Sequence, residues 1–169
     1  MIYTARDDGT AVLRLLVGRQ LQIVTNSVPI AMLFASRLES ELIMLGGYLY
    51  PRTGDAVGEI AISALKHIHA NKAFVGAAGI TAEGLFNVNM SIVEVERHIL
   101  KCADRKIILA DSSKFGKRAL AHLAPLTDVD LIVSDSGLDD QYRHMISEHH
   151  LQLKIAEGPS AYAPGANGK

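Results

Sequence analysis

The stretch from Lys106 to Lys114 constrains the fold of this chain more than any other. It reads Lys-Ile-Ile-Leu-Ala-Asp-Ser-Ser-Lys, an apolar run that ends in an acid, two hydroxyls and a lysine. Such a run predicts a buried strand at 107–110. Ligands of open α/β sheets bind at the carboxyl ends of the strands, so this ending indicates a site for an anionic, hydroxyl-rich ligand such as a sugar phosphate. The alternative is a simple strand-to-helix turn in which Ser112 or Ser113 caps the helix and Lys114 lies in solvent.

Three other predicted strands, at 2–5, 21–24 and 73–75, end in similar chemistry. The residues that follow them are Asp7, Gly9 and Thr10 after the first, Thr25, Asn26 and Ser27 after the second, and Gly76 to Gly79 after the third. The carboxyl ends of parallel strands meet at one edge of a sheet, so we expect these turns to converge. Backbone N–H groups at helix starts and beside glycines then bind phosphate with little side-chain charge.

Strands and helices alternate along the rest of the chain. Helices are predicted at 10–17, 27–36, 58–68, 92–102 and 138–149, and further strands at 41–45, 131–134 and 151–155. Residues 48–57 are predicted to be irregular, and 79–90 to form an excursion or a small hairpin. The pattern predicts an α/β fold with a mostly parallel sheet and helices on both faces. One domain is expected at 1–157, followed by a flexible tail at 158–169.

The composition excludes several classes of protein. A chain of 169 residues with 49% hydrophobic content suits one domain, and a net charge of −1 argues against nucleic-acid binding by this segment alone. The single cysteine, Cys102, is expected to pack, and one cysteine cannot form a disulfide framework. No signal peptide or membrane-spanning run is found, so a soluble cytoplasmic protein is expected, with no membrane partner. The seven histidines lack the spacing of a metal site.

Six short motifs occur in an order that resembles a known family. They are Asp7-x-Gly9-Thr10, Val24 to Ser27, Leu45-Gly46-Gly47, Phe74 to Ile80 with Gly84, Ala110 to Phe115, and Ile132 to Asp135. Together they resemble the effector-binding domain of DeoR-family transcriptional regulators, from about Ile2 to about Ala156. Ala11 and Ala78 depart from the family's pattern, in which a second threonine and an acid usually stand at these positions.

The resemblance implies a Rossmann-like fold similar to ribose-5-phosphate isomerase, and a phosphorylated sugar or related metabolite as effector. It also implies a homo-oligomer, and DNA binding only through a helix-turn-helix that this chain does not contain. No cofactor and no metal are implied. The ligand-binding residues implied are Asp7, Gly9, Thr10, Thr25, Asn26, Ser27, Gly46, Gly47, Gly76, Gly79, Asp111 and Lys114.

The comparison with the isomerase separates a sensor from an enzyme. The isomerase's two loop aspartates correspond to Val75 and Ala78, and its lysine has no counterpart near Phe86. Glu96 alone falls where the catalytic glutamate would be, and its simpler role is a solvated helix residue paired with Arg97 or Lys101. The sequence therefore predicts a sensor without catalytic residues, with a sugar-phosphate isomerase as the alternative. A nucleotide-binding Rossmann domain is a weaker third possibility, because no Gly-x-Gly-x-x-Gly follows the first strand.

Overall fold

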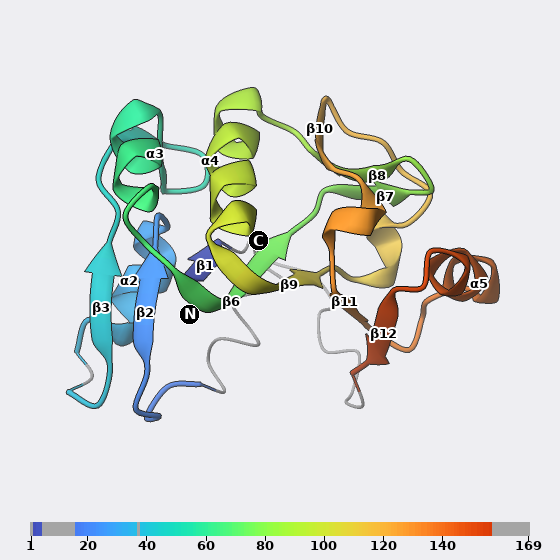
Figure 1. Ribbon diagram of the computed structural model, residues 1–169, viewed down its shortest axis with the longest axis horizontal. Helices are drawn as coiled ribbons and strands as arrows, with labels where there is room; N and C mark the ends of the chain where they lie inside the picture. The colour runs from blue at the N-terminus through green and yellow to red at the C-terminus, as the bar shows by residue number, and fades with distance from the viewer. Residues whose placement is uncertain (1, 5–15, 37, 157–169) are drawn as a thin grey trace, which may run out of the picture.

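The computed structural model describes the backbone of residues 2–4 and the whole of residues 16–36 and 38–156. Within these residues, a seven-stranded sheet has the order β12-β11-β9-β6-β1-β2-β3 (Figure 1). The strands are β1 (Ile2–Thr4), β2 (Gln22–Thr25), β3 (Glu41–Met44), β6 (Ala70–Gly76), β9 (Ala103–Leu109), β11 (Leu131–Ser134) and β12 (Gln152–Ile155). Every neighbouring pair is parallel, which confirms the predicted α/β fold.

The strand order changes direction beside β1. From β1 the chain builds outward through β2 and β3 on one side, and then through β6, β9, β11 and β12 on the other. The carboxyl ends of β1 and β6 therefore diverge into connections that run in opposite directions. Such a point is where open α/β sheets form their ligand crevice.

Helices cover both faces of the sheet. They are α2 (Val28–Phe34), α3 (Glu59–Leu65), α4 (Met90–Lys101) and α5 (Asp140–Glu148). Ile23 packs in one hydrophobic cluster with Ile30 and Phe34 of α2. The next residue, Val24, belongs to a second cluster that contains α3 and α4 side chains. Because successive side chains of a strand point to opposite faces, the two clusters lie on opposite sides of the sheet.

The excursion predicted at 79–90 is a β-hairpin. Strands β7 (Gly79–Thr81) and β8 (Gly84–Asn87) pair antiparallel, and β10 (Ala121–Ala124), which was not predicted, joins them. The segment before β10 also packs closely on β7, where Gly116 N donates to Ile80 O at 2.9 Å. A Cβ on Gly79 would overlap the carbonyl oxygen of Lys117, so this approach requires glycine.

The prediction of irregular structure at 48–57 is wrong. The segment forms a hairpin of β4 (Tyr48–Tyr50) and β5 (Asp55–Val57), with a turn that Gly54 closes at φ 72°. Contacts with the end of β2 hold this hairpin, since Val28 N donates to Gly54 O at 2.8 Å and Ala56 N donates to Asn26 O at 2.7 Å. The bonded residues lie about thirty residues apart in the chain, so the local sequence pattern of 48–57 does not predict these contacts.

Cys102 packs as predicted. It is half-buried, its Sγ lies 3.2 Å from Leu65 O, and burial raises the pKa of its thiol. No helix in the described part of the chain is long and apolar enough to cross a membrane.

Candidate functional site

The predicted site residues that the structure describes lie at the carboxyl-terminal edge of the sheet and in the turns that leave it. Thr25 ends β2, and Asn26 and Ser27 follow it. Gly46 and Gly47 follow β3, Gly76 ends β6, Gly79 begins β7, and residues 111–114 follow β9. Strands β2, β3, β6 and β9 belong to the parallel sheet, so their carboxyl ends share one edge, and β7 begins three residues after the end of β6. Asp7, Gly9 and Thr10, predicted after β1, lie outside the described residues.

The end of β2 is a buried polar segment. Thr25, Asn26 and Ser27 are all at most 2% exposed. Thr25 Oγ1 accepts from Ser27 N at 3.1 Å, and Asn26 Nδ2 donates to Ala56 O at 3.0 Å. Ser27 precedes α2, but its hydroxyl does not cap the helix. Polar side chains are rarely this deeply buried without a structural or binding role.

Two of the predicted glycines are required by backbone packing. Gly47 has φ 147°, and a Cβ there would lie 2.6 Å from Val57 O. Gly79 faces the Lys117 carbonyl, as described above. Gly46 is different, because a Cβ there would make only an ordinary contact, 3.8 Å from Ile60 Cγ2. Contact of these residues with a ligand stays a prediction.

The end of β9 is organised by Asp111. This residue, and neither Ser112 nor Ser113, caps the short 3-10 turn η1 (Ser112–Lys114), and its Oδ1 accepts from Ser113 N at 2.7 Å. Lys114 Nζ lies 3.5 Å from Asp111 Oδ2. Burial raises the pKa of Asp111, but the Ser113 hydrogen bonds and the Lys114 charge outweigh it and hold that pKa below its ordinary value. The serine-capping alternative is therefore wrong.

Asp135, directly after β11, joins the same edge and was not among the predicted site residues. Its Oδ2 accepts from Ser112 N and its Oδ1 from Gly137 N, both at 2.7 Å. Burial raises its pKa, yet these bonds lower the pKa further than burial raises it. The carboxylate therefore ties the β9 turn to the β11 turn. Its sequence signal is the same as that of Asp111, an acid that directly follows a buried strand.

Two buried oxygens at this edge lack a hydrogen-bond partner among the described residues. They are Asn26 Oδ1 at the end of β2 and Ser134 Oγ at the end of β11. Thr53 Oγ1, in the β4–β5 turn, is a third such atom. Buried oxygens without partners are uncommon in folded proteins, and an ordered water or a ligand is one of the ways in which such atoms are satisfied.

Glu96 is not the solvated residue that the sequence predicted. It is 2% exposed, and both of its carboxylate oxygens accept from Asn87 Nδ2 at 3.0 Å. Arg97, proposed as its partner, instead donates to the carbonyl oxygens of Leu123 and His122. Glu96 is buried because α4 presents this position to β8, and a helical charge pattern does not show which neighbour covers it.

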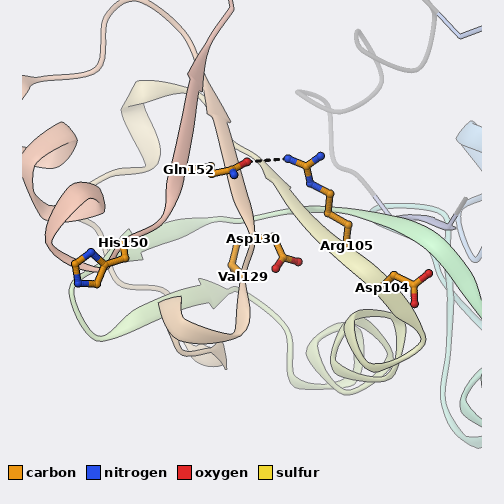
Figure 2. A pocket seen from close by; sticks show the side chains of 6 residues that line it. All are labelled: Asp104, Arg105, Val129, Asp130, His150 and Gln152. Carbon is orange, nitrogen blue, oxygen red and sulfur yellow. Dashed lines mark hydrogen bonds between the residues drawn. The ribbon is translucent and has the colours of Figure 1, made fainter.

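An open pocket of about 560 Å³ lies at the opposite edge of the sheet (Figure 2). It is lined by Asp104, Arg105, Val129, Asp130, His150 and Gln152, at or just before the amino ends of β9, β11 and β12. Arg105 Nη2 donates to Gln152 Oε1 at 2.8 Å, and Asp130 Oδ2 accepts from Lys106 N at 2.7 Å. Arg105 and Gln152 are therefore hydrogen-bonded to each other, and Asp130 is hydrogen-bonded to the backbone of Lys106. No group of three or more His, Cys, Asp or Glu in the described residues is placed to hold a metal ion.

The fold and the polar carboxyl-terminal edge define a doubly wound α/β domain of the ligand-binding class. Residues 7–136 match the DeoR C terminal sensor domain, and the chain belongs to that family. This confirms the resemblance found in the sequence.

Several curated relatives are transcriptional regulators. The chain is 32% identical to the HTH-type transcriptional regulator IolR of Bacillus subtilis, over 82% of this chain and 56% of that protein. It is 26% identical to the glycerol-3-phosphate regulon repressor of Escherichia coli, over 83% of this chain and 56% of that protein. It is 27% identical to the lactose phosphotransferase system repressor of Lactococcus lactis, over 81% of this chain and 54% of that protein. The chain thus spans about half the length of these relatives.

Proposed function

We propose that this chain is the effector-sensing part of a transcriptional repressor, and that its effector is a phosphorylated sugar or a related metabolite. The observation that carries the proposal is the gathering of polar residues from β2, β9 and β11 at one edge of the sheet in a domain of this family. Lys114 supplies a positive charge, and Asn26 and Ser27 supply buried polar groups. An effector with a phosphate group and several hydroxyl groups needs a cation for the phosphate and neutral polar groups for the hydroxyls.

The proposal extends to the whole regulator by analogy with its relatives. Two of them are named as repressors, one of a glycerol-3-phosphate regulon and one of a lactose phosphotransferase system. We place DNA binding in a helix-turn-helix outside this sequence, because a net charge of −1 does not suit a nucleic-acid surface. Effector binding here alters DNA binding there, in a cytoplasmic homo-oligomer.

Thermal unfolding of this chain in the presence of phosphorylated sugars tests the proposal. A ligand at a hundred times its dissociation constant adds about 2.7 kcal/mol to the free energy of unfolding, a shift of several degrees. The unphosphorylated sugars and inorganic phosphate are the controls. The absence of a shift with every member of a panel of pentose, hexose and triose phosphates would contradict the proposed effector class.

The alternative is an isomerase, and the surroundings of Glu96 disfavour it. Proton transfer between two carbons needs an accessible base and groups that stabilise the enediolate. Glu96 is buried against Asn87, while Val75 and Ala78 have no group that titrates. We expect no turnover of ribose 5-phosphate in D2O followed by NMR. Deuterium at C2, above a blank without protein and abolished by Glu96→Gln, would instead mean an enzyme.

A further inference from the structure

The orientation of the Asn26 amide is fixed by its neighbour. Its Nδ2 donates to Ala56 O at 3.0 Å, and Ala56 N donates to the Asn26 backbone oxygen at 2.7 Å. A flipped amide would place Asn26 Oδ1 against the Ala56 carbonyl oxygen, where two acceptors repel each other. The Nδ2 group is therefore the structural half of this side chain.

The other half, Oδ1, is a buried acceptor that the fold does not use. Asn26 is 1% exposed, and Oδ1 has no hydrogen-bond partner within the part of the chain that the structure describes. Leaving such an atom without a donor destabilises a protein. Asn26 follows β2, the neighbour of β1, at the carboxyl-terminal edge of the sheet, so a ligand bound there can supply the donor that the described residues lack.

An amide oxygen discriminates between the two ends of a sugar phosphate. It accepts from a hydroxyl but repels the oxygens of a phosphate dianion, which have no proton to donate above the second phosphate pKa of about 6. Lys114 has the opposite preference. The ends of β2 and β9 are separated by β1 and β6, which corresponds to three strand spacings or about 14 Å.

On the basis of the proposed function, we infer that Asn26 Oδ1 accepts from a hydroxyl of the effector, and that the phosphate lies toward the β9 end, at Lys114. Asn26 is then a specificity-determining residue that selects a ligand with a hydroxyl remote from its phosphate. This revises the sequence-based prediction, in which the β2 turn contributes to phosphate binding.

Calorimetry at pH 8 tests the inference by measuring how substitution of Asn26 and removal of one ligand hydroxyl, singly and together, change the affinity. The probes are ribose 5-phosphate, glucose 6-phosphate and fructose 6-phosphate, the monodeoxy analogues of whichever binds best, and inorganic phosphate. The wild-type chain is expected to bind one monodeoxy analogue at least about tenfold more weakly than its parent. In Asn26→Ala the parent weakens to the level of that analogue, the analogue itself weakens no further, and inorganic phosphate binds as before.

Two further variants separate this role from a structural one. Asn26→Asp retains an acceptor oxygen but loses the bond to Ala56, so it keeps the discrimination even if its melting temperature falls. It therefore decides the question if Asn26→Ala does not fold. Gln152→Ala removes an amide at the opposite edge of the sheet and leaves all the affinities unchanged.

Three outcomes overturn the inference. In the first, Asn26→Ala loses affinity equally for the parent sugar phosphate and for all its analogues, and Asn26→Asp no longer distinguishes the parent from the analogue. That result would mean that Asn26 only stabilises the position of β5. Another is weaker binding of inorganic phosphate in Asn26→Ala, which would place the phosphate at β2. The third is the absence of binding of any phosphorylated sugar to the wild-type chain, which alone would also remove the proposed function.

Discussion

Replacing Asn87 by alanine tests whether the buried pair with Glu96 stabilises the fold. Asn87 is fully buried, and its Nδ2 lies 3.0 Å from both carboxylate oxygens of Glu96. Its Oδ1 accepts from Val88 N, also at 3.0 Å. The substitution therefore removes one hydrogen-bonding group that faces a carboxylate and one that faces a backbone amide.

The expected loss of stability follows from these two contacts. A hydrogen bond to a charged group contributes about 1.5–3 kcal/mol, and one between neutral groups about 0.5–1.5 kcal/mol. We expect Asn87→Ala to lower the free energy of unfolding by about 2–4.5 kcal/mol. That is a large fraction of the roughly 5–15 kcal/mol by which domains are stable.

Urea unfolding at pH 7 measures this loss, and a double-mutant cycle with Glu96→Gln assigns it. With a neutral glutamine at 96, loss of Asn87 should cost at least about 1 kcal/mol less than it does in the wild type. Asn89→Ala is the matched control, because Asn89 Oδ1 caps α4 by accepting from Ser91 N and Ile92 N, and its loss costs about 1 kcal/mol. A cost below 1 kcal/mol for Asn87→Ala, or an equal cost in both backgrounds, would refute the reasoning.

Three further predictions concern the carboxyl-terminal edge of the sheet and the turns that leave it. Lys114→Ala should weaken the binding of a phosphorylated ligand by about 1.5–3 kcal/mol in calorimetry, whereas Lys66→Ala, which breaks an exposed pair with Glu59, should leave the affinity unchanged. Equal affinities of the two variants would remove Lys114 from the site. Gly79→Ala should lower the urea midpoint by the equivalent of about 1–3 kcal/mol, because its Cβ would lie 2.9 Å from the Lys117 carbonyl carbon. Gly46→Ala should be well tolerated, and similar midpoints for the two variants would contradict the packing argument. The lowered pKa values of Asp111 and Asp135 contribute stability that is fully present above the ordinary carboxyl pKa near 3.8 and is lost as the pH falls below it. The free energy of unfolding, measured from pH 6 to pH 3, should therefore decline less steeply in Asp135→Asn than in the wild type. Parallel curves would show that Asp135 contributes nothing.

The sequence by itself determined the parallel sheet and the edge of the sheet at which the candidate site lies. Runs such as 107–110 and 131–134 are continuous apolar segments, and a strand buried on both faces needs such a segment whatever its neighbours are. The polar residues that end these runs are fixed by chain connectivity. A parallel sheet then brings Asn26, Lys114 and Asp135 to one edge without any further information.

Only the tertiary structure decided which buried polar atoms have a hydrogen-bond partner within the described residues and which do not. Asn26 Nδ2 is used by Ala56, Asp135 by Ser112 and Gly137, and the carboxylate of Glu96 by Asn87, whereas Asn26 Oδ1 has no partner among the described residues. The partners of Asn26, Asp135 and Glu96 lie between 2 and 30 residues away along the chain, and most of them belong to another element. Hydrogen bonding depends on distances of a few ångströms between such elements, and helical or strand periodicity carries no information about them. The same physical reason hid the β4–β5 hairpin and the burial of Glu96 from the sequence.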